Sequence, residues 1–277
     1  MNGILAPRAR PGAVQADPLA GLREILQATR PEADLGLIQR AYEVAAAWHH
    51  GQTRLSGDPY ITHPLAVATI MAGLGASDQV LCAALLHDTT ADTACTFAEL
   101  DREFGSEITA LVAGIAALDQ GRYRDAGTLA QAIAAAKAAD RQVLAIKVAD
   151  RLHNMRTVEF LPPDKQLRKA TEARDVFVPA ARLLRLDTVE SELETLASAT
   201  LSRNRHARTA SGRLLAATAA LLPPATQARW REEWLAELST LPARRSRARF
   251  AAHTLLAIPR LAVTLRHPAP GTTQARP

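Results

Sequence analysis

The stretch QVLCAALLHDTTAD, residues 79–92, decides the fold. An uninterrupted apolar run from Val80 to Leu86 leads directly into His87 and Asp88, so two polar side chains follow a segment that is expected to be buried. Burying an imidazole and a carboxylate costs free energy unless an interaction replaces their lost hydration. Coordination of a metal ion is such an interaction. The stretch therefore predicts a buried helix that ends at a metal site.

Two further motifs complete this predicted site. His63 lies in YITHP, before a helix for which Pro64 fits the first position, so His63 is expected at or near the cap. Asp150 lies in KVADRLHN and shares a helical face with Asn154, four residues later. Two imidazoles and two carboxylates suit a borderline or hard divalent ion such as manganese. The expected metal ligands are His63, His87, Asp88 and Asp150.

The composition favours an all-α fold. Hydrophobic residues make up 48% of the 277 residues but aromatic residues only 4%, and alanine and leucine dominate, which suits packed helices better than β-branched strands. Cys82 and Cys95 stand in no paired metal or redox spacing. No signal peptide and no run of about 18 apolar residues occurs. We therefore expect a cytoplasmic protein.

Charge separates the C-terminal part from the rest. Residues 203–277 contain thirteen arginines and three glutamates, a balance of +10 within a total of +5, so residues 1–202 carry −5. The basic character thus belongs to the tail and not to the predicted metal site. The expected division is a flexible lead with a short helix (1–34), a metal-dependent domain (35–200), a linker (201–213), a basic amphipathic helical tail (214–266) and a disordered end (267–277).

Five motifs in order resemble one known family. They are WHHGQTRLSGDPYITHPLAVA, AALLHDTTADT, FGSEITALVAGI, IKVADRLHNMRT and KQLRKATEARDVFVPAARLL, within residues 35–186. Together they resemble the hydrolase domain of the RelA/SpoT homologues. The likeness is strongest to the stand-alone small alarmone hydrolases of the HD phosphohydrolase superfamily. An ordered set of motifs is far more specific than a bare His-Asp pair.

The resemblance implies an HD-domain helical bundle with a defined activity. It implies a guanosine-3′,5′-bis(diphosphate) 3′-pyrophosphohydrolase, which removes the 3′-pyrophosphate of guanosine tetra- or pentaphosphate with one manganese ion. It implies the same four metal ligands. It also implies that Arg54 and Ser56, from a loop, and Asn154 and Thr157, from a later helix, contact the guanine nucleotide. No synthetase domain is expected after the linker.

The chain departs from the family pattern at Ala91. The family has an adjacent Glu-Asp pair after the His-Asp dyad, whereas this chain has Ala91 and Asp92. The missing Glu is thought to orient or deprotonate the attacking water, and a positioned general base contributes about 10²- to 10⁴-fold. Asp92 and the metal ligand Asp88 are then the expected catalytic residues, with Asp58 as an alternative base. Leu55, the residue after Arg54, also stands where relatives commonly have Lys.

Two other functions stay open. One is hydrolysis of a different nucleotide by an HD phosphohydrolase. The other, motivated by Ala91, is a degenerate domain that binds the alarmone without turnover and passes the signal to a partner. For the tail, arginines beside Trp230 and Trp234 suggest contact with an anionic membrane or nucleic acid, and the alternative is a packed helical pair with a solvated basic face. These arginines are Arg244, Arg245, Arg247 and Arg249.

Overall fold

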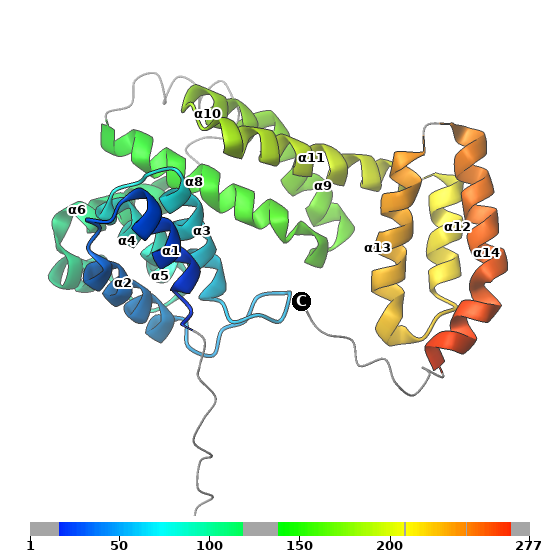
Figure 1. Cartoon of the computed structure of the whole chain (residues 1–277), viewed down its shortest axis with the longest axis horizontal. Helices are drawn as coiled ribbons and strands as arrows, with labels where there is room; N and C mark the ends of the chain where they lie inside the picture. Colours follow the sequence, from blue (N-terminus) through cyan, green and yellow to red (C-terminus); the bar gives the residue numbers. More distant parts are fainter. Residues whose placement is uncertain (1–16, 119–137, 208, 242, 267–277) are drawn as a thin grey trace, which may run out of the picture. The chain divides into compact units, whose positions relative to one another are not determined.

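The computed structural model confirms an all-α fold (Figure 1). It describes residues 17–118, 138–207, 209–241 and 243–266. Within these ranges the β pairing is limited to an isolated bridge between Thr53 and Pro59. The chain divides into two compact units. The first contains the described residues 17–118 and 138–149, and the second contains those from 150 onward.

The first unit is built around a central buried helix. Its elements are α1 (Ala20–Thr29), α2 (Leu35–Trp48), α3 (Thr62–Gly73), α4 (Asp78–Leu86), α5 (Thr89–Asp92), α6 (Phe97–Ala117) and the first part of α8 (Ala138–Arg156). Every residue of α4 from Val80 to Leu86 is buried, because α2, α3 and α6 all pack against it. A helix that is apolar on all sides is stable only in such surroundings. The predicted buried helix is confirmed.

Local hydrogen bonds set where these helices begin. The side chain of Asp34 accepts from the amide of Leu37 at the start of α2, and Ser77 does the same for α4. The spacing of Thr96 and Glu99 in the sequence predicts a capping box, and the two residues form it at the start of α6. Each such cap contributes about 1 kcal/mol. Within α6 the backbone kinks at Gly105, whose φ of 80° favours glycine.

One predicted boundary near the site is wrong. Helix α3 begins at Thr62, with Ile61 as its cap, so His63 lies near the cap as expected, in the first turn, but Pro64 is not the first helical residue. Pro64 is consequently the third helical residue. The first four backbone amides of a helix have no acceptor within it, so proline is tolerated there without loss of a hydrogen bond. His63 still projects from a regular helix, α3, which restricts the position of its side chain.

The second unit begins within α8. Its further elements are η2 (Val158–Phe160), α9 (Pro163–Glu172), η3 (Ala173–Phe177), α10 (Val178–Leu183), α11 (Asp187–Ala207), α12 (Ala210–Ala219), α13 (Pro224–Thr240) and α14 (Arg244–Arg266). Helices α12, α13 and α14 lie side by side (Figure 1). They share a small core that includes Leu215, Trp234 and Leu238. The sequence places Trp230, Trp234 and Leu238 on one stripe of a helix, and in the structure Trp234 and Leu238 are buried in this core with Trp230 packed against it.

Secondary structure in the C-terminal part differs from expectation at two places. The stretch predicted as a linker is mostly helical, since α11 runs to Ala207 and α12 begins at Ala210. Its arginines and alanines are good helix formers, so a basic composition suits a helix as well as a linker. The sequence also predicts a break at Pro259 within the tail, whereas helix α14 continues through that residue. The predicted domain boundaries themselves stay predictions.

Some predicted segments fall outside the described residues. These are the lead before residue 17, the loop at 121–127, most of the alanine-rich helix predicted for 129–139, and the end at 267–277. Among the helices that the structure does describe, none combines the length and apolar character needed to span a bilayer.

Candidate active site

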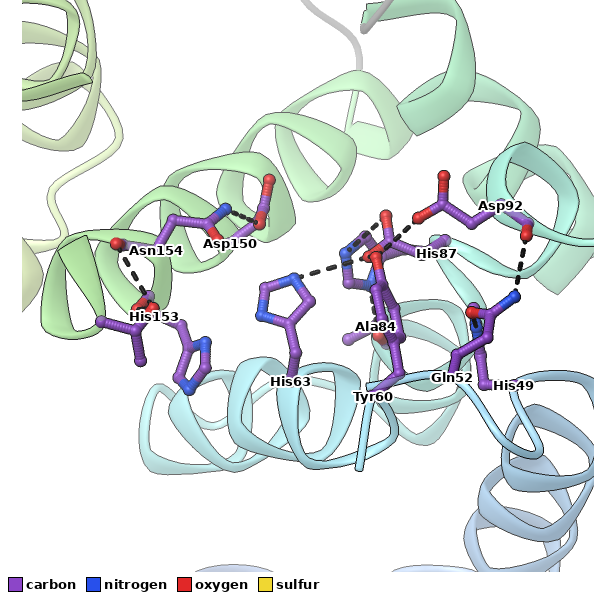
Figure 2. Close-up of polar contacts among 12 residues, drawn as sticks. His49, Gln52, Tyr60, His63, Ala84, His87, Asp92, Asp150, His153 and Asn154 are labelled. Carbon is purple, nitrogen blue, oxygen red and sulfur yellow. Dashed lines mark hydrogen bonds and ion pairs between the residues drawn. The ribbon is translucent and has the colours of Figure 1, made fainter. Parts of the chain in front are cut away.

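Three predicted metal ligands meet in the first unit. His63 projects from α3, His87 follows the last residue of α4, and Asp88 is next along the chain. Each offers one ligand atom, and these atoms lie within 4.8 Å of one another. The two imidazole rings meet edge to face, with centroids 5.2 Å apart (Figure 2). Their side chains are almost fully buried, whereas that of Asp88 is 18% exposed.

The hydrogen bonds of His87 fit a cation at this position. Its Nδ1 lies 2.8 Å from the carbonyl oxygen of Ala84, which can only accept, so Nδ1 carries a hydrogen. In the neutral ring Nε2 then holds a lone pair. That atom lies 3.1 Å from Oδ1 of Asp88, another acceptor. Two acceptors at this distance repel unless a proton or a cation lies between them, so the donor set suits a divalent metal.

Asp88 is oriented by its backbone. It is the cap residue of the short helix α5, and its carbonyl oxygen accepts from the amides of Ala91 and Asp92. Its side chain does not cap the helix. Instead Oδ2 lies 3.5 Å from Nε2 of His63, while Oδ1 faces His87. Both carboxylate oxygens are thus directed at the two imidazoles.

Tyr60 connects Asp88 to Asp92. Its hydroxyl lies 2.8 Å from Oδ2 of Asp88 and 2.6 Å from Oδ2 of Asp92 (Figure 2). Burial, the charges of the two carboxylates and the hydrogen bonds to them raise the pKa of the Tyr60 phenol far above its ordinary value. The phenol therefore stays protonated, and its single hydrogen is shared between the two carboxylates. Sequence reasoning gave Tyr60 no role, although it stands three residues before His63.

Two residues of the preceding segment hold Tyr60 and Asp92. The ring of His49, which is 2% exposed, stacks on that of Tyr60 with centroids 4.5 Å apart. Its Nδ1 lies 2.8 Å from Oε1 of Gln52. Gln52 in turn donates from Nε2 to the backbone oxygen of Asp92 at 3.1 Å (Figure 2). These contacts close a ring through Asp92 and fix it at the end of α5.

The loop between α2 and α3 carries two predicted substrate contacts. The guanidinium carbon of Arg54 lies 6.0 Å from the centroid of the Tyr60 ring, the ring whose hydroxyl contacts Asp88 and Asp92. Ser56 instead donates its hydroxyl hydrogen to Oδ2 of Asp58 at 2.7 Å. Asp58, the alternative base, therefore accepts a hydrogen bond within the loop. Leu55, which stands between Arg54 and Ser56 in the sequence, is 71% exposed.

The remaining predicted residues belong to the second unit. Asn154 donates from Nδ2 to Oδ1 of Asp150 at 2.6 Å, so the two share a helical face as expected. The hydroxyl of Thr157 donates back to the oxygen of His153 at 3.3 Å. Lys169, overlooked in the sequence, is close enough for its charge to interact with that of Asp150, and burial lowers its pKa. The participation of Asp150 in the metal site stays a prediction.

Comparison with known proteins gives a consistent assignment for the same part of the chain. Residues 41–187 match a family model described as HD domain. A probable GTP pyrophosphokinase of Mycobacterium leprae is 51% identical over 64% of this chain and 23% of its own length. The bifunctional (p)ppGpp synthase/hydrolase SpoT of Escherichia coli K12 is 41% identical over 67% of this chain and 27% of its own length. The chain thus spans about a quarter of these relatives.

A solved structure gives a weaker match. It is titled as a metazoan ortholog of SpoT that hydrolyses ppGpp, and it covers 58% of this chain and 93% of its own. Its TM-score is 0.47 and its sequence identity is 22%. Likeness at this level is too low to support a conclusion about either fold or function.

Proposed function

Because this chain belongs to the HD domain family, we propose that it removes the 3′-pyrophosphate of guanosine tetra- and pentaphosphate with the help of one divalent cation, manganese being the expected ion. The relative named (p)ppGpp synthase/hydrolase supports the substrate class. The observation that carries the proposal is the approach of Nε2 of His87 to Oδ1 of Asp88, which a cation would stabilise.

The chain supplies most of the proposed ligand set within one unit. His63, His87 and Asp88 would hold the cation, with Asp150 as the fourth ligand. When bound, such a cation supplies Lewis acidity, which polarises a phosphoryl oxygen and lowers the pKa of a coordinated water toward ~7. The near-complete burial of both imidazoles keeps competing water away from them.

The proposed base is Asp92. Its Oδ2 would accept a proton from the attacking water while the oxygen of that water bonds to the phosphorus next to the ribose. The bond between that phosphorus and the 3′ oxygen would break, so pyrophosphate leaves and the 3′ oxygen takes up a proton to become a hydroxyl. Tyr60 contacts this carboxylate and that of the proposed metal ligand Asp88, so the two carboxylates stay close to each other. Arg54 and Ser56 on the loop, and Asn154 and Thr157 in the second unit, are the proposed contacts to the guanine nucleotide.

Ala91 favours a second candidate function. Without the family's Glu only one carboxylate follows the dyad, and loss of a positioned base slows a reaction by about 10²- to 10⁴-fold. The chain would then act as an alarmone-binding regulator with slow or no turnover. Hydrolysis of another nucleotide is the remaining alternative within the same chemistry.

A turnover assay combined with a binding titration tests these proposals. Guanosine tetraphosphate is incubated with the full chain and manganese, and pyrophosphate release is measured. We expect release by the parent protein, loss of release in His87→Ala and Asp150→Ala, and full release in His50→Ala, in which an exposed histidine is removed. Tight binding without release would favour the regulator. Cleavage of a different nucleotide alone would contradict the proposed substrate.

A further inference from the structure

A second cluster of charged residues surrounds a cavity in the second unit. The cavity has a volume of about 580 Å³ and lies where α11 ends and α12 and α14 begin. Among the described residues, three arginines and no acidic residue line it. The lining residues are Arg205, Thr209, Ala210, Ser211, Arg244 and Arg247. The arginines come from two helices far apart in the sequence, so the fold, and not a local charge run, creates this concentration of positive charge.

A neighbouring cavity extends the same charged surface. Its volume is about 640 Å³, and Arg205 lines both cavities. Arg174 and Arg231 add two further guanidinium groups, together with the amide of Asn204. Arg174 already binds Asp175, with 2.6 Å between Nε and Oδ1. Asp164 also lines this second cavity, whereas the described lining of the smaller cavity contains no carboxylate, so positive charge prevails more strongly in the smaller one.

The acidic residues nearby in the sequence are engaged elsewhere. Glu232 lies 3.7 Å from Arg203, and Glu233 lies 4.0 Å from Arg229. Among the residues that the structure describes, Arg205 and Arg244 have no carboxylate within ion-pair distance. Like charges gathered around one cavity repel each other, and a bound anion relieves that repulsion. The cavity thus offers a favourable place for a multiply charged anion.

The chemistry of the walls favours phosphate among anions. Guanidinium groups present paired N–H donors in a planar fork that matches two phosphate oxygens. The hydroxyls of Thr209 and Ser211 offer further donors, and Thr209 already fixes the start of α12 through the amide of Gly212. The volume falls within the range of sites for ligands of nucleotide size.

We propose that this cavity binds a soluble phosphorylated small molecule with at least two negative charges. The arginines line a concave site, which suits a compact ligand better than the flat surface of a membrane or a nucleic-acid duplex. The site uses none of the residues of the candidate active site, and the proposal does not depend on the proposed function. The basic tail then serves as a ligand-binding element instead of a general anchor.

Calorimetric titration of the full chain with inorganic pyrophosphate, in the presence of EDTA, tests the site. The double variant R244Q/R247Q removes two lining arginines, and R245Q/R249Q removes two arginines of the same helix that do not line the cavity. Both lower the net charge equally. We expect about tenfold or greater weakening in the first and less than about twofold in the second, since charge-assisted hydrogen bonds are worth more than distant charges.

Further measurements decide between the remaining explanations. Arg205→Gln, which alters one residue of the cavity wall, should also weaken binding, and circular dichroism identifies any variant that fails to fold. His87→Ala should leave pyrophosphate binding unchanged. Equal weakening in the two double variants, absence of binding, or loss of binding in His87→Ala would overturn the proposal. Binding to phosphatidylglycerol vesicles without pyrophosphate binding would identify a lipid surface instead and would also overturn it.

Discussion

The phenolic oxygen of Tyr60 lies 2.6 Å from Oδ2 of Asp92, the carboxylate that remains where the family has a Glu-Asp pair. The same oxygen contacts Asp88, so a single hydroxyl links the proposed base to a proposed metal ligand. A hydroxyl has one hydrogen to donate, and both carboxylates compete for it. The Asp92 side chain is thus held by Tyr60, in addition to the contact of its backbone oxygen with Gln52.

Tyr60→Phe should reduce turnover of guanosine tetraphosphate by about tenfold, because a hydrogen bond to an ionised group is worth roughly 1.5–3 kcal/mol. The Michaelis constant should change little, since the phenol holds carboxylates and not the nucleotide. Steady-state kinetics measures both quantities. Tyr42→Phe removes the equivalent oxygen from α2 and should have no effect. A similar loss in both variants would show a general structural cause.

Ala91→Glu should restore the missing carboxylate. Ala91 is exposed on α5, so a longer side chain needs no space inside the core. We expect turnover to rise by about tenfold or more, within the range that a positioned base supplies. Ala91→Gln, of the same size but without charge, is the matched control in the same assay. No difference between the two variants would show that this position does not limit the reaction.

Manganese should stabilise the first unit. A ligand present at about 100 times its dissociation constant adds roughly 2.7 kcal/mol to the free energy of unfolding. For a domain of this size we expect the melting temperature to rise by about 5 °C or more relative to EDTA. Thermal melting followed by circular dichroism measures the shift. His87→Ala should abolish it and His50→Ala should retain it, whereas an unchanged shift in His87→Ala would argue against this ligand.

The sequence predicted those parts of the site that strong local patterns specify. The apolar run from Val80 to Leu86 is long and uninterrupted, so both the burial of α4 and the position of His87 at its end followed from it. The box formed by Thr96 and Glu99 likewise depends on residues three apart, and the structure forms it as expected. Such features need no knowledge of the tertiary fold.

Contacts that depend on the path of a loop could not be predicted. Tyr60 reaches Asp92 because the segment after α2 folds back, with the amide of Tyr60 bonded to the oxygen of Gln52 and the ring of His49 stacked on its own. No periodic pattern encodes that return. The helical continuation of α11 to Ala207 was missed for another reason: a polar, basic composition suits a solvated helix as well as a linker.

Stability should fall at high pH because of Cys82. Burial, with the charges of Asp78 and Asp34, raises the pKa of its thiol to about 12, whereas the unfolded thiol titrates near ~8.5. The contribution of the buried Cys82 thiol to the free energy of unfolding is therefore fully present below pH ~8.5 and is lost as the pH rises toward 12. Urea unfolding at pH 8 and pH 10 should show about 2 kcal/mol more loss in the parent protein than in Cys82→Ala. Equal losses would contradict this assignment.

The Arg151–Glu172 ion pair should contribute more to stability than a solvated pair. Nη2 of Arg151 lies 3.0 Å from Oε1 of Glu172, and the arginine side chain is only 9% exposed, with its guanidinium 4.5 Å from the Phe177 ring centroid. Glu172→Gln would leave this cation buried without its countercharge. We expect a loss of about 1–3 kcal/mol, below the value for fully buried pairs because Glu172 itself is 40% exposed.

Glu192→Gln provides the matched comparison for that pair. Glu192 binds Arg156 at 2.7 Å, but both side chains are about 40% exposed, so solvent screens the interaction. Its loss should cost less than about 1 kcal/mol in the same urea titration. The larger effect is expected at the longer ion pair, because the burial of the arginine, and not the separation of charges, sets the penalty for an unpaired cation. Equal effects would show that Arg151 is hydrated when its partner is removed.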